Sequence, residues 1–148
     1  MSKKDELTSY LNAIYQNTKT ALQSIEDIMP KIECKDLKDE IAREQDAYYV
    51  LARECEVFAK SEKIEGIKDN NWIEKAKLWT SINMSTLTDK SNRKIAELML
   101  LGTFMGIITC YKDQGDHKDV SPELDEIVER LKELERNNIT RLIPFLER

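Results

Sequence analysis

Few side chains in this sequence could do chemistry. His117 is the only histidine and there are three cysteines, so a Ser-His-Asp or Cys-His nucleophile has little to draw on. The sequence also has no glycine-rich phosphate loop. The carboxylates are more informative, because Glu44 and Glu97 stand in stretches that otherwise indicate buried helix faces. Carboxylate oxygens suit hard cations such as Mn²⁺ or Mg²⁺, provided that the fold brings several of them to one point.

Glu44 interrupts an apolar stripe in the segment from about Asp36 to Lys60. Its neighbours at spacings of three and four, Ile41 and Tyr48, predict a helix with one buried face. A buried carboxylate without a partner is costly, which leaves two interpretations open. Glu44 is either a metal ligand or a structural carboxylate, and we favour the structural role because one ligand does not make a site. In that role it tilts to the edge of the stripe or bonds to a nearby Lys, Tyr or Thr, with Tyr10, Tyr15 and Thr18 as candidates.

Glu97 is the other carboxylate in apolar surroundings, near the start of a predicted helix. It could hold a metal ion or a lysine of a partner protein, but a solvent-facing position or a first-turn electrostatic contact is the simpler interpretation. A two-carboxylate site requires the folded chain to bring Glu44 and Glu97 together. The sequence therefore predicts no metal and no cofactor, with Glu44 and Glu97 as the candidate ligands if a metal is bound.

The three cysteines, Cys34, Cys55 and Cys110, are odd in number and widely spaced, without a Cys-x-x-Cys pair. This pattern favours a reduced, cytoplasmic protein, as does an N-terminus without the apolar segment of a signal peptide. Cys34 is the strongest candidate for a reactive thiol, because Lys31 and Lys35 can favour its thiolate. An inert exposed thiol is the simpler interpretation.

Long helices are predicted to position these groups. The apolar residues from Leu7 to Ile28 follow a 3.5-residue repeat, and Pro30 lies just past the end of this first helix. The second helix, from about Asp36 to Lys60, follows after a short connection. The two are therefore expected to form an antiparallel hairpin.

The second predicted hairpin runs from Thr88-Asp89, which can start a helix, to Pro144, which kinks or ends one. The first of its helices ends near Gly115 and is apolar on nearly every side. Gly102 and Gly106, one turn apart, allow another helix to approach closely. Packing within the bundle is favoured there over a contact between two chains.

The last predicted helix begins at Ser121-Pro122, which supply a capping hydroxyl and a proline at the first helical position. Its stripe of core residues includes Leu131, Leu134 and Asn138. The charged positions indicate a solvated face with ion pairs three and four residues apart. This face contains Glu123, Glu126, Lys132, Glu133, Glu135 and Arg136.

The segment between the hairpins is predicted to be a loop over residues 61–70, followed by a short helix from Asn71 to about Leu87. Trp72 and Trp79, seven residues apart, lie on one face of that helix. They can anchor the crossover to the bundle or cap an interface between chains, and we favour the first role.

Composition bounds the class of protein. The 148 residues correspond to one domain, 1–148, and the low counts of 4 glycines and 3 prolines argue against loop-rich all-β folds. The net charge of −5 gives no support to a surface for nucleic acid or anionic membrane. The longest uncharged run, Leu98 to Tyr111, has 14 residues, fewer than the roughly 18–20 that cross a bilayer. We therefore expect an all-α bundle that binds neither nucleic acid nor membrane.

The chain resembles the ferritin-like superfamily, in particular a group of small bacterial ferritin-like proteins. The resemblance covers nearly the whole chain and rests on its length, the order of hairpin, crossover and hairpin, and two stretches. One stretch runs from Leu37 to Gln45, and the other is Ile95-Ala96-Glu97-Leu98, followed by Gly102 and Tyr111. The resemblance implies a ferritin-like four-helix bundle with a short fifth helix in the crossover.

The sequence departs from that family at its metal site. Metal-binding members place a Glu on each of two helices and a Glu-x-x-His on each of the other two. Here Thr18 and Thr103 stand where carboxylates would fit, Ala47 stands three residues after Glu44, and His117 falls in a predicted loop. The departure argues against iron oxidation and storage.

We therefore expect a non-enzymatic bundle that acts through protein contacts, as a homodimer and with a protein partner that the sequence does not identify. A degenerate binder of a metal or small ligand, which uses the bundle carboxylates, is the alternative. A redox-responsive protein that uses Cys34 is a third, weaker hypothesis.

Overall fold

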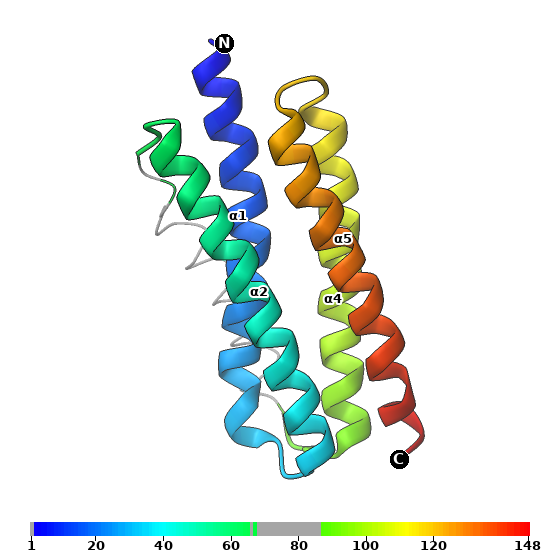
Figure 1. The fold of residues 1–148 in the computed structure, drawn as a ribbon. Coiled ribbons are helices and arrows are strands. Elements are labelled where there is room, and N and C mark those ends of the chain that lie inside the picture. The colour runs from blue at the N-terminus through cyan, green and yellow to red at the C-terminus, as the bar shows by residue number, and fades with distance from the viewer. Residues whose placement is uncertain (1, 66, 68–86) are drawn as a thin grey trace.

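The computed structural model describes residues 2–65, 67 and 87–148. Within these ranges every regular element is helical, which confirms the predicted all-α class. Short 3-10 turns follow the first and last long helices, at Met29–Lys31 and Ile143–Glu147. The long helices are α1 (Lys3–Ile28), α2 (Lys35–Ser61), α4 (Asn92–Asp116) and α5 (Pro122–Leu142) (Figure 1).

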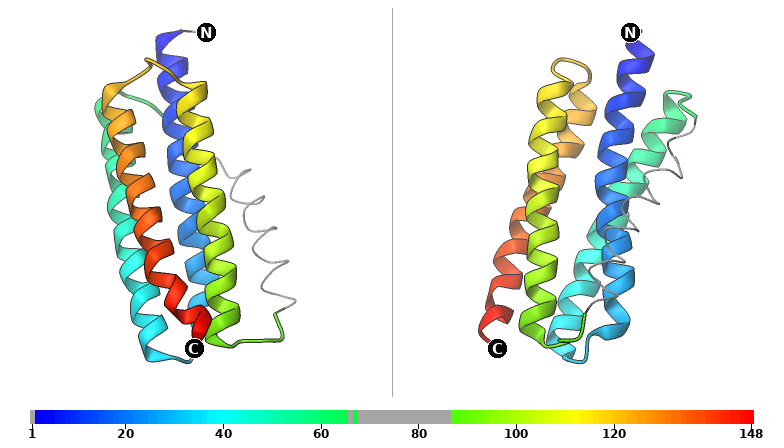
Figure 2. Two further views of the ribbon diagram at one scale, coloured as in Figure 1. Left: turned by 90° about the vertical axis from the view of Figure 1, so that its right-hand side faces the viewer. Right: turned by 180° about the vertical axis from the view of Figure 1, so that it is seen from behind.

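These four helices form two antiparallel hairpins that lie side by side (Figures 1 and 2). α1 packs on α2 and α4 packs on α5, while α1 also contacts α4 and α2 contacts α5. α2 ends at the opposite end of the bundle from the start of α4, which corresponds to the predicted order of hairpin, crossover and hairpin. The short helix predicted from Asn71 to about Leu87, with Trp72 and Trp79, lies outside the described residues except for Leu87 itself.

The start of α4 differs from the prediction. Thr88-Asp89 were expected to begin this helix, but it begins at Asn92. The Ser91 hydroxyl accepts a hydrogen bond from the Lys94 backbone N–H at 3.2 Å, so Ser91 is the capping residue. Asp89 instead accepts from the Ser91 backbone N–H at 2.9 Å and so orders the chain that leads into the cap.

The core is built from the apolar stripes that the sequence shows. In α1 the buried residues recur at spacings of three and four from Tyr10 to Ile28, and the α2 stripe from Leu37 to Ala59 faces them. Burial of such stripes is what holds an amphipathic helix in place, because isolated helices gain little from propensity alone. The fully buried side chains come from all four helices and include Leu11, Ile14, Ile25, Leu37, Ile41, Ile95, Leu124, Leu131 and Leu142.

α4 carries apolar residues on its outer side as well as its inner side. Its buried face includes Ile95, Met99 and Leu100. Its outer side presents five large apolar residues whose side chains are each between 51 and 57% exposed. We call this surface the α4 apolar face; it consists of Leu101, Phe104, Met105, Ile108 and Tyr111.

The apolar length of α4 exceeds its uncharged run. Among the helices within the described ranges, α4 alone is long and apolar enough to cross a membrane by length and composition, a test that the core helix of a soluble protein also passes. The uncharged run of 14 residues therefore underestimates the length of the apolar segment in α4, because a longer window with up to two charged residues is still strongly apolar.

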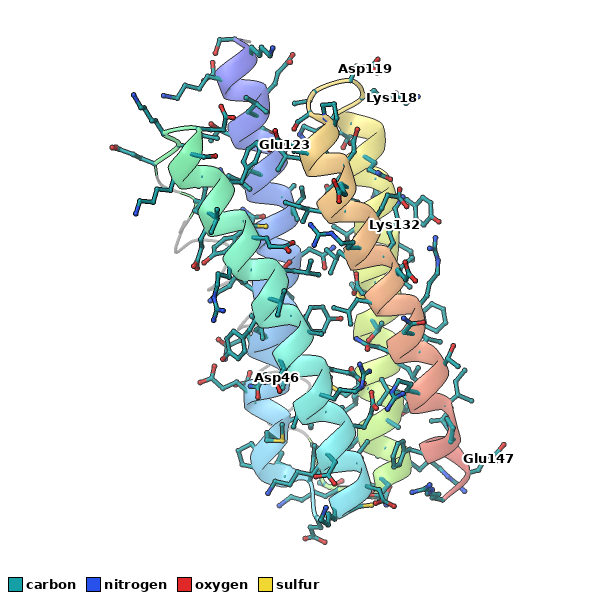
Figure 3. The ribbon with its side chains drawn as sticks, in the orientation of Figure 1. Asp46, Lys118, Asp119, Glu123, Lys132 and Glu147 are labelled. Atoms are coloured by element: carbon teal, nitrogen blue, oxygen red, sulfur yellow. The ribbon has the colours of Figure 1, made fainter. Side chains whose placement is uncertain are left out.

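The charged face expected on α5 is only partly solvated. Lys132 and Glu135 are 4% and 1% exposed, so their assignment to a solvent-facing surface was wrong. The Lys132 ammonium lies 4.0 Å from the ring centroid of Tyr111 and 3.0 Å from Glu129 Oε1, and it also contacts Gln114 (Figure 3). The remaining members of the predicted face, which are Glu123, Glu126, Glu133 and Arg136, are exposed.

Candidate functional site

A chain of polar side chains runs through the interior of the bundle. Residues of all four helices contribute to it, and most of them are nearly inaccessible to solvent. Buried polar groups need partners, and ionisable groups with shifted pKa values cluster at functional sites, so this cluster is a candidate functional site. We call it the polar network; it consists of Glu40, Arg43, Glu44 and Tyr48 on α2, Glu135, Asn138 and Arg141 on α5, Cys110 on α4 and Asn17 on α1.

Glu40 holds the charged end of the network. Its Oε2 accepts from Arg43 at 2.8 Å, and its Oε1 accepts from Arg141 of the facing helix at 2.6 Å. Burial by itself raises the pKa of this carboxyl, but hydrogen bonds from Arg43, Glu44 and Arg141 outweigh burial and bring its pKa down to about 2. Glu40 is therefore an anion that two cations already neutralise, which leaves it poorly suited to bind a metal ion.

Glu44 is the neutral counterpart of Glu40. It is 1% exposed, and burial, with hydrogen bonding to Glu40 and the nearby Glu40 charge, raises its pKa far above the usual range. A protonated Glu44 can donate to Glu40. Its Oε2 atom is buried without any hydrogen-bond partner.

The partners expected for Glu44 were wrong. Tyr10 donates to Asp125 at 2.5 Å and Tyr15 donates to Glu56 at 2.8 Å. The Thr18 hydroxyl donates to the Ile14 carbonyl of its own helix at 3.0 Å. Helix rotation explains the difference, because Glu44 lies on the side of α2 that faces α5, where Arg141 is a neighbour.

Tyr48 and Asn138 continue the network. Arg43 donates to Asn138 Oδ1 at 3.1 Å, and the Asn138 amide donates to the Tyr48 hydroxyl at 3.3 Å. The Tyr48 hydroxyl lies 3.4 Å from Glu135 Oε2, as a donor. Each of these polar atoms therefore has a partner on the facing helix, which fixes the register of α2 against α5.

Glu135 is the third buried carboxyl of the network, after Glu40 and Glu44, and sequence reasoning missed it. Burial raises its pKa to about 8, although hydrogen bonds from Cys110 and Tyr48 act in the opposite direction. The Cys110 thiol lies 3.6 Å from Glu135 Oε1, and burial raises the pKa of that thiol. A signal was present, because Leu131, Glu135 and Asn138 follow spacings of four and three that match a buried stripe.

Gly106 leaves space for Glu135. A Cβ atom on Gly106 would overlap Glu135 Oε2, whereas a Cβ on Gly102 would meet no atom within 4 Å. The Gly106 carbonyl also accepts from the Asn17 amide of α1 at 3.0 Å. Close packing therefore occurs at Gly106 against a carboxyl side chain, and the close packing expected at Gly102 is not found.

The other predicted residues lie outside this network. Glu97 is exposed and pairs with Lys94 at 2.6 Å, so the structure does not bring it to Glu44. Cys34 is partly buried at the position that precedes α2, and Cys55 is buried in the core. His117 caps the end of α4, where its ring stacks on Tyr10 with centroids 4.8 Å apart.

The network can hold protons and dipoles away from solvent. Within the described part of the chain, no group of three or more His, Cys, Asp and Glu side chains is arranged to hold a metal ion. Burial raises the pKa of both Glu44 and Glu135, which favours their protonated forms, and each is 1% exposed. The arrangement therefore favours one packing of the helices, with the carboxyl groups of Glu44 and Glu135 held between them.

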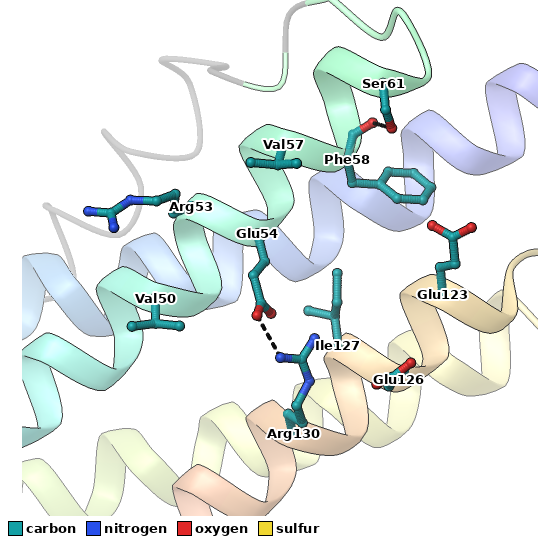
Figure 4. Close-up of a pocket in the computed structure, with 10 residues that line it drawn as sticks. All are labelled: Val50, Arg53, Glu54, Val57, Phe58, Ser61, Glu123, Glu126, Ile127 and Arg130. Atoms are coloured by element: carbon teal, nitrogen blue, oxygen red, sulfur yellow. Dashed lines mark hydrogen bonds and ion pairs between the residues drawn. The ribbon is translucent and has the colours of Figure 1, made fainter.

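A groove lies between α2 and α5. It encloses about 420 Å³ between the two helices (Figure 4). Val50, Val57, Phe58 and Ile127 supply apolar lining, and the ion pair of Glu54 with Arg130 bridges the two helices at 2.6 Å. This groove was not predicted from the sequence, because its lining depends on how the two hairpins dock.

The spacing at Gly106 leads to a prediction about stability. Gly106→Ala forces the Glu135 carboxyl out of its position, so we expect it to lower the free energy of unfolding by about 1–3 kcal/mol. Gly102→Ala is the matched control, with open space at its Cβ, and is expected to raise the free energy of unfolding by roughly 0.5–1 kcal/mol. Urea unfolding of both variants measures the difference. Equal stabilities of the two variants would show that Glu135 is free to move.

The pKa of Glu135 leads to a prediction about pH. Its carboxyl ionises near 4.5 in the unfolded chain and near 8 in the folded one, so the folded state retains a proton that the unfolded state releases. The stabilisation present below pH 4.5 is therefore lost as pH rises through 8. The free energy of unfolding of Glu135→Gln, relative to that of the wild type, is therefore expected to rise by about 2 kcal/mol between pH 5.5 and pH 7.5.

Urea unfolding at the two pH values measures this difference in the free energy of unfolding. The contribution of Glu44 to the pH dependence cancels, because both proteins contain Glu44. Glu133→Gln, at an exposed position of the same helix, is the control. Its free energy of unfolding should differ from that of the wild type by the same amount at both pH values. A Glu135→Gln difference that stays constant with pH would mean that Glu135 is ionised in the folded protein.

Comparison with protein-family models, with curated proteins and with solved structures found no match for this chain.

Proposed function

We propose that this protein is a non-enzymatic helical bundle that acts through protein contacts and forms a homodimer through the α4 apolar face. The observation that carries the proposal is the exposure of five large apolar residues in one line on α4. Single exposed apolar residues are normal on a protein surface, but a contiguous group marks an interaction site. Aromatic residues and methionine, which occur here at Phe104, Met105 and Tyr111, are enriched in such interfaces.

The buried acids support a role without catalysis. A catalytic acid or base must come within hydrogen-bond reach of a substrate. Glu44 and Glu135 are sealed between helices, and Glu40 is held by Arg43 and Arg141. Their most economical role is to specify one packing of the two hairpins, as polar groups in the interiors of some helical assemblies do.

The ferritin-like plan is part of the proposal. Two antiparallel hairpins in the order α1–α2 and α4–α5 support it. Glu44 on α2 and Glu135 on α5 stand on facing helices, and Glu135 with Asn138 repeats the spacing of a Glu-x-x-His motif with Asn in place of His. We propose a bacterial, cytoplasmic relative that retains the polar interior of that family without its histidines.

Self-association through the α4 apolar face can be tested with one charge. Phe104→Asp places a carboxylate in the middle of this face, so we expect the dimer to dissociate into folded monomers. Sedimentation equilibrium gives the molar mass and circular dichroism the helix content. Tyr49→Asp is the control, because Tyr49 is 47% exposed on α2 and lies outside the face. A wild-type chain that stays monomeric at high concentration would end the proposal.

A second candidate function follows from the orphan oxygen of Glu44. No group among the described residues donates a hydrogen bond to the buried Glu44 Oε2, so a bound ligand could supply a donor or a metal ion there. This favours the alternative of a degenerate binder of a metal or small ligand that uses the bundle carboxylates. It competes with the interaction role and requires Glu44 to give up its proton or to accept a new donor.

Elemental analysis separates the two candidates. Protein purified without chelator or metal-affinity tag is expected to contain Fe, Mn and Zn well below one ion per chain if the interaction role is correct. The second candidate instead requires at least one ion per chain, lost in Glu44→Ala and kept in Glu97→Ala, which removes an exposed carboxylate of α4 as a control.

A further inference from the structure

The α4 apolar face is large enough to form the centre of an interface. Half of a large apolar side chain amounts to roughly 100 Å², so the five residues together present roughly 500 Å² of accessible surface. A stable interface takes about 800 Å² from each partner. The face therefore supplies more than half of this area, and the polar residues at its two ends can supply the rest.

The ends of the face carry complementary charges on one line of the helix. Glu97, Leu101, Met105, Ile108 and Lys112 follow spacings of four, four, three and four, so Glu97 and Lys112 stand at opposite ends of the same stripe. Both end residues are exposed. Glu97 already contacts Lys94 at 2.6 Å, an exposed pair that solvent screens and that a second cation can join.

We propose that the α4 apolar face binds a second copy of itself in antiparallel orientation, about a two-fold axis that crosses α4 between Phe104 and Met105. This inference rests on the homodimer of the proposed function and adds its geometry. In this arrangement Leu101 meets Ile108 of the second copy, and Phe104 meets its own counterpart beside the axis. Glu97 meets the Lys112 end of the second copy, and the symmetry makes this contact twice.

The cationic end of the face is stronger than Lys112 alone. Arg136 of α5 donates to the Tyr111 hydroxyl, which places a second cation beside that end of the stripe. An incoming Glu97 carboxylate therefore meets Lys112 on one side and the Arg136–Tyr111 pair on the other. Lys94 and Arg93 flank Glu97 at the opposite end. Glu97 is the one anion among these three residues, so the antiparallel arrangement also brings Lys94 and Arg93 near the cationic end of the second copy.

A parallel arrangement of the same two faces is disfavoured by charge. About a two-fold axis parallel to α4, every residue faces its own counterpart, so Lys112 meets Lys112 and Glu97 meets Glu97. Like charges in contact weaken an association, whereas the antiparallel arrangement pairs opposite charges in the same positions. The apolar residues fit either arrangement, so the proposed orientation rests on the pairing of Glu97 with Lys112.

Charge reversal tests the orientation directly. Glu97→Lys and Lys112→Glu each create two like-charge contacts in the antiparallel dimer, and we expect each to weaken dimerisation about tenfold in sedimentation equilibrium at low salt. The double variant Glu97→Lys/Lys112→Glu restores both contacts in reversed form and should return to within about threefold of the wild type. Asp46→Lys, an exposed change on α2, is the control for altered net charge.

Three outcomes would overturn the inference, and they can be told apart. A dimer that Phe104→Asp dissociates but that the double variant does not restore keeps the proposed function and excludes this orientation. A dimer that survives Phe104→Asp has its interface elsewhere. A wild-type chain that stays monomeric excludes both the homodimer and its geometry. Flotation of that monomer with phosphatidylcholine vesicles would then identify lipid as the partner of the face.

Discussion

The interior of this bundle depends on the neutralisation of Glu40. Its carboxylate lies between Arg43 of the same helix and Arg141 of the facing helix, at 2.8 and 2.6 Å. An unpaired anion at this depth would cost far more than the marginal stability of a small domain can tolerate. Burial and the adjacent Glu40 anion raise the pKa of Glu44, the next carboxyl along α2, although Arg43 and Arg141 act in the opposite direction. The amide of Asn138 and the hydroxyl of Tyr48 then extend the network to Glu135.

This polar interior changes what α4 contributes to the fold. In most bundles a helix buries its apolar side and exposes its polar side. α4 brings Thr103, Gly106 and Cys110 to the interior and keeps Phe104, Met105 and Ile108 outside. Part of the hydrophobic free energy of this helix is therefore not used in folding the single chain. That free energy is released only when another apolar surface covers the outer side of α4. The proposed association and the polar network are therefore linked, because they use opposite sides of the same helix.

Much of the fold could be predicted from local patterns. The stripes of α1 and α2 run at spacings of three and four, and Ser121 with Pro122 starts α5 as expected, with the Ser121 hydroxyl 3.2 Å from the Leu124 backbone nitrogen. The start of α4 was misplaced because several polar residues before it can cap a helix. The candidate site was predicted only in part, since Glu44 stood out in an apolar stripe while Glu135 stood among other charges and resembled a surface residue.

The sequence by itself determined that this chain forms long amphipathic helices and that Glu44 falls on the apolar stripe of one of them, because periodicity is a property of each helix alone. The short connections between helices predicted the antiparallel hairpins. Only the tertiary structure decided that Glu135 and Lys132 turn inward and that Arg141 rather than Tyr10 is the neighbour of Glu44. It also decided that, among the described residues, large apolar side chains of α4 lie exposed on its outer side. Neighbouring positions on a helix differ by about 100° of rotation, so a sequence stripe fixes the buried side only to within one residue. The docking of one hairpin on the other determines which of the neighbouring positions is buried.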